Sequence, residues 1–170
     1  MAITYHLWLK PSGKAYDILE KTISDLSRSN QGPCFDPHVT LLSSLTGTEE
    51  EISFRSERLG ISLQSFEIQL TEPAFGDQYF QCVFLKAQES PALMDAHERA
   101  RKLFVQNTSP YMPHLSLLYG HYPIERKHKI TTTLSETLRL TFTVDKFDLI
   151  RAGSEDPKDW ISILTVPMSR

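Results

Sequence analysis

Two short blocks of this sequence nearly repeat each other, and both hold residues suited to acid–base chemistry. Residues 37–42 read PHVTLL and residues 113–118 read PHLSLL. Each block places a histidine two residues before a hydroxyl side chain, within an apolar run that is typical of a strand. Alternate side chains of a strand point to the same face. We therefore expect each histidine to share a face with its hydroxyl residue.

His38 and His114 could act as acid and base from opposite sides of one reacting atom. Histidine has an unperturbed pKa of about 6.5, so one imidazole can take a proton from water while the other donates one. In-line displacement at phosphorus needs these two groups on opposite sides of the phosphate, and pseudo-two-fold symmetry would put them there. The hydroxyls of Thr40 and Ser116 can then donate hydrogen bonds to the phosphate oxygens. The four residues predict a phosphoryl-transfer site that needs no metal ion and no other cofactor.

The elements around the two blocks also occur in one order, a strand and a helix before each block and a helix and a strand after it. Residues 3–10 alternate as a first strand, with Thr4, His6 and Trp8 on one face. The periodicity predicts the following further elements: helices over 15–27, 48–60, 91–106 and 124–135, and strands over 65–70, 79–86, 138–151 and 160–166.

This order predicts an internal repeat, with halves of about 1–72 and 73–170, within a single domain over 1–170. Two copies are too few for a stacked array of repeats. We expect a bilobal α+β fold with pseudo-two-fold symmetry. Two antiparallel sheets should flank a central cleft, with the helices outside.

Composition excludes several other classes of protein. The chain has 170 residues and a formal net charge of −3, which gives no bulk attraction to an extended nucleic acid. It has no apolar run of the ~18 residues that a membrane span requires, and its N-terminus lacks the pattern of a signal peptide. Cys34 and Cys82 form neither a disulfide framework nor a metal motif. We expect an intracellular protein, cytoplasmic or alternatively nuclear.

With their flanks, the two blocks resemble the two-histidine (2H) phosphoesterases, and most closely the eukaryotic-type cyclic phosphodiesterases. The resemblance covers nearly the whole chain. A single His-x-Thr motif would be weak evidence, whereas two with these flanks are specific. The segments that carry the resemblance are 5–11 (YHLWLKP), 37–40 (PHVT), 79–84 (YFQCVF) and 110–120 (PYMPHLSLLYG).

The resemblance implies both the catalytic and the substrate-binding residues. The catalytic set is His38, Thr40, His114 and Ser116. The aromatic residues that would line the cleft against a base or ribose are Trp8, Phe80 and Tyr119. Tyr119 has the wrong parity for the face of His114, so it reaches the cleft only if the strand ends or twists at Gly120. Of the other histidines, we expect His6 to pack and the remaining three to lie on the surface: His97, His121 and His128.

The resemblance also implies an activity, the metal-independent hydrolysis of small cyclic phosphates. Its substrates would be ADP-ribose 1″,2″-cyclic phosphate, opened to the 1″-phosphate, and nucleoside 2′,3′-cyclic phosphates, opened to 2′-phosphates. The context would be the by-products of tRNA splicing. We expect His114 to act as base and His38 as acid, in a monomer whose partner is a small nucleotide, with no membrane and no extended nucleic acid.

Two alternatives stay open at this stage. One is an RNA-end 2′,3′-cyclic phosphodiesterase or ligase-like 2H protein, which would need a basic track leading from the cleft. The other is a non-catalytic 2H domain that binds RNA or a nucleotide. A degenerate binder would be expected to lose a histidine or a hydroxyl of the motifs, and all four residues are present.

Overall fold

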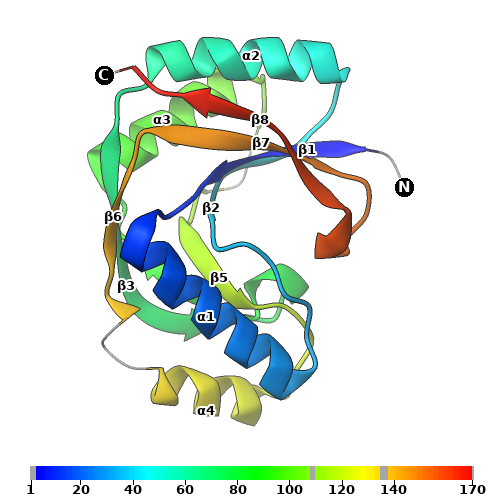
Figure 1. Ribbon diagram of the computed structural model, residues 1–170, viewed down its shortest axis with the longest axis vertical. Coiled ribbons are helices and arrows are strands. Elements are labelled where there is room, and N and C mark those ends of the chain that lie inside the picture. The colour runs from blue at the N-terminus through cyan, green and yellow to red at the C-terminus, as the bar shows by residue number, and fades with distance from the viewer. Residues whose placement is uncertain (1–2, 108–109, 135–137, 170) are drawn as a thin grey trace.

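The computed structural model describes residues 3–107, 110–134 and 138–169 (Figure 1). It confirms the predicted alternation of strands and helices along most of the chain. The helices are α1 (Gly13–Asn30), α2 (Glu49–Ser62), α3 (Pro91–Leu103) and α4 (Ile124–Thr133). The strands are β1 (Thr4–Leu9), β2 (Val39–Leu45), β3 (Phe66–Phe75), β4 (Val83–Ala87), β5 (His114–Leu118), β6 (Thr141–Val144), β7 (Lys146–Ala152) and β8 (Trp160–Pro167).

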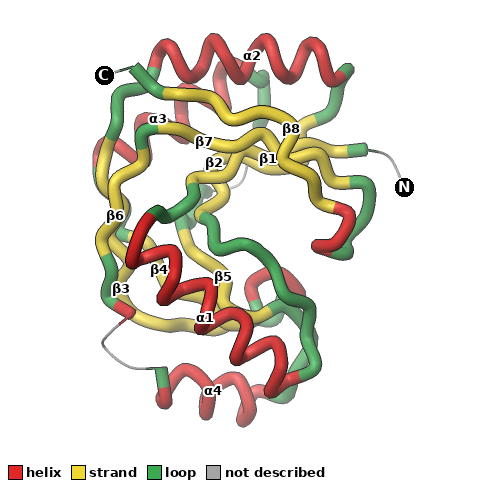
Figure 2. Tube along the Cα trace, in the orientation of Figure 1, coloured by secondary structure: helices red, strands yellow, loops and turns green. Residues whose placement is uncertain are grey.

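The strands form one curled antiparallel sheet in the order β6-β3-β4-β5-β2-β1-β7-β8. The two sheets expected from the sequence are the two halves of this sheet, β6-β3-β4-β5 and β2-β1-β7-β8. The halves join where Val39 of β2 pairs with Leu115 of β5. Figure 2 shows the two groups of strands, which meet where β2 lies next to β5. The fold class is α+β, as predicted.

The strand order is symmetric about the β2–β5 junction, but each half of the sequence places its last strand or strands in the other lobe: β3 from the first half, β7 and β8 from the second. β3 follows α2 in the first half of the sequence and pairs with β4, the first strand of the second half. β7 pairs in turn with β1. The helices follow the same exchange, since α1 packs on β5 and α3 packs on β2. The two lobes are therefore mixtures of the sequence halves 1–72 and 73–170.

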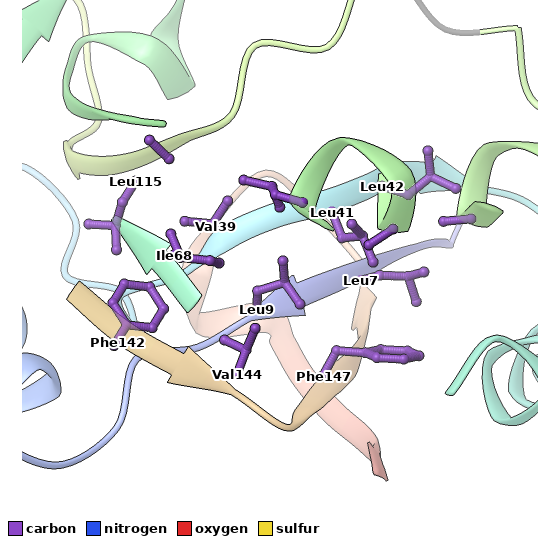
Figure 3. Packing of buried hydrophobic residues seen from close by; sticks show 14 of the residues in the cluster. Leu7, Leu9, Val39, Leu41, Leu42, Ile68, Leu115, Phe142, Val144 and Phe147 are labelled. Atoms are coloured by element: carbon purple, nitrogen blue, oxygen red, sulfur yellow. The ribbon is translucent and has the colours of Figure 1, made fainter. Parts of the chain in front are cut away.

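The apolar side chains of the central strands point away from the face that carries the histidines. Leu7 and Leu9 of β1 are fully buried, and they alternate with Thr4, His6 and Trp8 on the opposite face. The labelled members of this core in Figure 3 are Leu7, Leu9, Val39, Leu41, Leu42, Ile68, Leu115, Phe142, Val144 and Phe147. Truncating a buried leucine to alanine costs about 2–5 kcal/mol, so this cluster fixes which face of each strand is available for chemistry.

Two helices begin at the residues that the sequence indicates. The Thr48 hydroxyl accepts a hydrogen bond from the Glu51 backbone N–H, and the Glu51 carboxylate accepts one from the Thr48 N–H. This capping box contributes about 1 kcal/mol. At the start of α3 the Ser90 hydroxyl accepts a hydrogen bond from the Leu93 backbone N–H, and Pro91 lies in the first turn. No helix among the described residues is long and apolar enough to cross a membrane.

Two predicted strands differ in the structure. Residues 79–86 begin as a 3₁₀ turn (Tyr79–Gln81), because the Tyr79 and Phe80 carbonyls accept hydrogen bonds from the Gly120 N–H and the Ser116 hydroxyl rather than from a neighbouring strand. The strand predicted over 138–151 breaks at Asp145, where the chain passes from β6 in one half to β7 in the other. The end of the helix predicted over 124–135 lies outside the described residues.

Candidate active site

Both predicted catalytic histidines are held by the same backbone contact. His38 Nδ1 lies 2.7 Å from the Asp36 carbonyl oxygen, and His114 Nδ1 lies 2.9 Å from the Met112 carbonyl oxygen. A carbonyl can only accept a hydrogen bond, so Nδ1 carries the proton in each ring. The Nε2 atom of each neutral ring is therefore the one that can take up a proton.

The β2–β5 junction brings the two motifs together. Extending the antiparallel Val39–Leu115 pair by one residue in each direction sets Thr40 opposite His114 and Ser116 opposite His38. These four residues line one cleft of about 440 Å³. The structure thus brings together every side chain of the predicted catalytic set in the lining of one cleft.

The two rings differ in burial and in charge. His38 is only 6% exposed, and burial lowers its pKa to about 3, with a further lowering by the positive charge of Lys10. The hydrogen bond to the Asp36 carbonyl opposes this shift. Burial also lowers the pKa of His114, against the opposing hydrogen bond to Met112. Both rings are neutral at pH 7 in the free protein, and His38 is the harder one to protonate.

An aromatic ring flanks each histidine, in a different geometry. Trp8 stacks on His38 with ring centroids 3.5 Å apart and an interplanar angle of 6°, whereas the edge of Phe84 meets His114 at 5.1 Å and 61°. Trp8 and Phe84 each precede their histidine by 30 residues. Sequence reasoning did not single out Phe84, although this equal spacing would have identified it.

The two hydroxyls of the motifs also have different partners. The Ser116 hydroxyl donates to the Phe80 carbonyl at 2.7 Å. The Thr40 hydroxyl has no hydrogen-bond partner among the described residues, while the Thr40 carbonyl accepts one from the Tyr111 hydroxyl at 2.8 Å. Thr40 can therefore donate to a phosphate oxygen without giving up an existing bond, and Ser116 must first release the Phe80 carbonyl.

The predicted aromatic residues all line the cleft. β5 ends at Leu118, so Tyr119 reaches the cleft despite its parity and stacks on Phe35, with centroids 3.7 Å apart. Trp160, which the sequence had placed only at the start of a strand, also lines the cleft. Its ring lies 5.6 Å from Trp8, 5.9 Å from Phe80 and 6.0 Å from Tyr119.

Two further histidines have different places from those expected. His6 was expected to pack, and it lines the cleft. His97 was expected on the surface, but it is buried: its Nδ1 lies 2.8 Å from the Leu41 carbonyl and its ring stacks on Tyr111. His97 and Tyr111 together hold the β2 backbone next to Thr40. The surface prediction was wrong because His97 lies on the face of α3 that packs on β2.

The sequence of this chain is similar to those of known proteins. A family model described as cyclic phosphodiesterase-like protein matches residues 1–160. A cyclic phosphodiesterase of Arabidopsis thaliana is 32% identical over 157 residues, which cover 89% of this chain and 87% of that protein. A 2′,3′-cyclic-nucleotide 3′-phosphodiesterase of Yarrowia lipolytica is 27% identical over 141 residues, which cover 76% of this chain and 63% of that protein.

Solved structures share the fold at low sequence identity. LigT of E. coli in its apo form superposes with a TM-score of 0.68 at 14% identity, over 98% of both chains. LigT complexed with 3′-AMP gives 0.69 at 13% identity over 100% of both chains. A protein of Thermus thermophilus gives 0.69 at 18% identity over 97% of both chains. These likenesses extend over the whole curled sheet and its helices.

Proposed function

Because this chain belongs to the cyclic phosphodiesterase-like family of two-histidine (2H) phosphoesterases, we propose that it hydrolyses small 2′,3′-cyclic phosphates with His38 and His114 as acid and base. One observation carries the proposal. Both imidazoles are fixed through Nδ1 by a carbonyl two residues earlier, and both line one cleft with Thr40 and Ser116. This arrangement leaves two Nε2 atoms for a single phosphate.

The reaction follows from this arrangement. His114 Nε2 takes a proton from a water molecule as the water oxygen forms a bond to phosphorus. The bond between phosphorus and the ribose 3′ oxygen breaks, and His38 donates its proton to that oxygen. The product is a 2′-phosphate, and the two histidines return to their starting states by exchanging protons with solvent. Thr40 and Ser116 donate hydrogen bonds to the phosphate oxygens, where negative charge gathers.

The surroundings of His38 support its role as the acid. A cation is attracted to the face of a tryptophan ring, and the Trp8 face lies flat against His38. An anionic phosphate in the cleft adds a second attraction to the protonated ring. These contributions oppose the burial that lowers the pKa of His38 in the free protein, so His38 takes up its proton together with the substrate. His114, which only meets an aromatic edge, stays neutral and acts as the base.

The proposed substrates are nucleoside 2′,3′-cyclic phosphates and ADP-ribose 1″,2″-cyclic phosphate, the latter a by-product of tRNA splicing, in the cytoplasm. The activities named for the Arabidopsis and Yarrowia relatives support a cyclic phosphate. Of the described residues that line the cleft, only Glu155 carries a formal charge at pH 7. This favours a small substrate over an RNA end, which would call for lysines or arginines along its path. We propose that the protein acts as a monomer.

Product identification tests the proposal. Adenosine 2′,3′-cyclic phosphate and ADP-ribose 1″,2″-cyclic phosphate are incubated with wild type, His38→Ala and His114→Ala, all in the presence of EDTA. We expect a 2′-phosphate and a 1″-phosphate from the wild type, with no loss on chelation. Each variant should lose at least ~10²-fold in kcat, the low end for an acid or base. His128→Ala, on the exposed surface of α4, is the matched control and should keep wild-type activity.

Two results would overturn the proposal. A histidine variant that keeps near wild-type activity would exclude the two-histidine mechanism. Binding of both cyclic phosphates without turnover would favour the non-catalytic binding domain. An RNA oligonucleotide ending in a 2′,3′-cyclic phosphate, opened faster than the mononucleotide, would instead favour the RNA-end activity.

A further inference from the structure

A β-bulge next to the active site turns two consecutive serines into the cleft. Tyr5 of β1 pairs with Leu45 of β2, and Leu7 pairs with Leu42. Only His6 lies between the paired residues on β1, whereas two serines lie between their partners on β2. Consecutive residues of a regular strand point to opposite faces. At a bulge two residues oppose one, and here Ser43 and Ser44 both line the cleft.

The bulge also fixes the state of the third histidine in the cleft. Ser44 has a φ of 58°, in the left-handed region that a non-glycine residue seldom adopts. Its backbone N–H lies 3.4 Å from His6 Nδ1, and His6 Nε2 lies 3.3 Å from the Thr4 hydroxyl. An N–H can only donate, so Nδ1 is the acceptor and Nε2 carries the proton. Burial lowers the pKa of His6 to about 4, which keeps the ring neutral at pH 7.

We call these side chains the polar arm of the cleft: Thr4, His6, Ser43 and Ser44. The polar arm contains three hydroxyls and one imidazole N–H, the latter directed at the Thr4 hydroxyl, and none of these groups is charged at pH 7. The nearest formal charge in the cleft lining is the carboxylate of Glu155, and no lysine or arginine occurs among the described lining residues. The polar arm therefore suits an uncharged ligand with both donors and acceptors rather than a second phosphate.

The polar arm lies beside the catalytic histidines along β1. His6 is two residues along β1 from Trp8, a distance of about 7 Å, and Trp8 covers His38 and pairs with Thr40. We infer that the polar arm binds the edge of an uncharged nucleobase while the cyclic phosphate sits between the catalytic histidines. This inference rests on the proposed hydrolysis of cyclic nucleotides and names a subsite that selects base-bearing substrates.

The pseudo-symmetry of the molecule shows that the polar arm serves one side of the substrate. Cys82 is the counterpart of His6 in the second half, 32 residues before its motif histidine. It is fully buried and does not line the cleft. The catalytic groups obey the two-fold symmetry because a phosphate is approached from two sides. The polar arm breaks the symmetry, as expected of a site for a base that is attached on only one side.

A pair of substrates that differ only in the base tests this subsite. Adenosine 2′,3′-cyclic phosphate is compared with methyl riboside 2,3-cyclic phosphate, in which a methoxy group replaces the base. His6→Phe keeps an aromatic ring and removes the hydrogen-bonding nitrogens. We expect it to lower kcat/KM for the adenosine substrate about tenfold, the effect of one lost hydrogen bond. The methyl riboside should be hydrolysed as by wild type, and His128→Phe should change neither value.

Two milder variants guard against a folding defect in His6→Phe. Ser44→Gly removes a hydroxyl and relieves the left-handed backbone conformation, and Ser43→Ala removes the neighbouring hydroxyl. Each should lower kcat/KM for the base-bearing substrate several-fold and leave the methyl riboside unchanged. Equal losses on both substrates, or no loss on either, would overturn the inference. A loss confined to ADP-ribose 1″,2″-cyclic phosphate would also overturn it, because the polar arm would then hold a pyrophosphate.

A binding measurement separates failure of this inference from failure of the proposed function. Calorimetry compares adenosine 2′-phosphate with methyl riboside 2-phosphate on wild type and His6→Phe, and it needs no turnover. Tighter binding of the adenosine compound by wild type, lost in the variant, supports the subsite even if no cyclic phosphate is hydrolysed. Equal affinities for the two compounds in wild type contradict the subsite even where hydrolysis is established.

Discussion

The His38 half and the His114 half of the cleft use the same backbone contact but surround it differently. In each half, Nδ1 of the histidine donates to the carbonyl two residues earlier. The His38 ring is buried under the face of Trp8, whereas the His114 ring is more open and meets the edge of Phe84. The backbone contact fixes the tautomer that both roles need. In the proposed mechanism, the surroundings decide which ring holds a proton once a phosphate is bound.

The ion pairs near the two histidines are likewise shared by both halves but differ in their surroundings. Lys10 binds Asp148 at 3.1 Å, and Lys86, at the equivalent position of the other half, binds Glu72 at 3.0 Å. Only the first half adds a carboxylate at the residue that supports its histidine. Asp36 binds Lys10 at 2.9 Å and accepts a hydrogen bond from Tyr16 at 3.1 Å. Met112 takes the place of Asp36 in the second half.

In the proposed mechanism, this difference would let a duplicated fold produce an acid and a base from one motif. Asp36 links the loop whose carbonyl holds His38 to α1 through Tyr16 and to Lys10 after β1, and Lys10 in turn binds Asp148 of β7. We therefore expect this ring to be the more firmly positioned of the two. The His114 ring depends on a carbonyl whose own side chain, Met112, is exposed. We expect the chemistry to be more sensitive to changes around His38.

The motif hydroxyls give the largest expected difference between the halves. Thr40→Ala should lower kcat about 10²-fold, because it removes a donor that is free to meet the phosphate. Ser116→Ala should lower it only about tenfold, because this hydroxyl already donates to the Phe80 carbonyl. Steady-state kinetics on adenosine 2′,3′-cyclic phosphate measure both values, with Thr40→Ser as the control that keeps the hydroxyl. A larger loss in kcat for Ser116→Ala than for Thr40→Ala would contradict this difference between the two hydroxyls.

The second-largest difference is expected in how strongly His38 and His114 make the free energy of unfolding depend on pH. Unfolding returns His38 from a pKa of about 3 to about 6.5, so below pH 6.5 the unfolded state binds more protons and the free energy of unfolding falls as the pH drops. Between pH 7 and pH 5 the His38 contribution is roughly 2 kcal/mol. Urea unfolding at both pH values should show that His38→Gln removes more of this dependence than His114→Gln. The contribution of His6 is common to both variants. A greater effect of His114→Gln contradicts the assignment.

The smallest effect is expected at the support of His38. Asp36→Asn weakens the contact with Lys10 and leaves the carbonyl that holds the ring, so kcat should fall only several-fold with KM unchanged. Because Asp36 positions the His38 ring, the limb of the pH–rate profile that reports the titration of His38 should also shift in Asp36→Asn. Met112→Leu, the matched change in the other half, should leave both unchanged. Unchanged kinetics in Asp36→Asn would show that these ion pairs serve stability alone.

The sequence predicted that the two pairs of histidine and hydroxyl residue lie in one cleft because their signal is local. Two histidines and two hydroxyls recur at the same spacing, and strand alternation then decides their faces. The bulge at Ser43 and Ser44 could not be predicted from alternation, which assigns consecutive residues to opposite faces. Trp160 was missed because β8 reaches the cleft only through pairing with β7, a contact between distant parts of the chain. The prediction of one long strand over 138–151 was wrong for a related reason, since alternation does not show where a chain passes from one lobe to the other.

Phe84 and His97 show two other limits of prediction from the sequence. The 30-residue spacing that relates Trp8 to Phe84 is visible in the sequence, but the family resemblance drew attention to Phe80. Phe80 lies in a 3₁₀ turn, and its carbonyl accepts a hydrogen bond from the Ser116 hydroxyl. The role of His97 depends on the exchange of helices between the halves, which brings α3 onto β2. Local patterns carry no information on such an exchange.

A change of leaving group tests most directly whether the two histidines divide the roles of acid and base. Catechol cyclic phosphate releases a phenolate, whose conjugate acid has a pKa of about 10, so it needs far less protonation than a ribose oxygen. We predict that His38→Ala, which loses at least ~10²-fold on adenosine 2′,3′-cyclic phosphate, loses about tenfold or less on the catechol substrate, while His114→Ala is impaired on both. Equal losses of both variants on both substrates would contradict this division of roles.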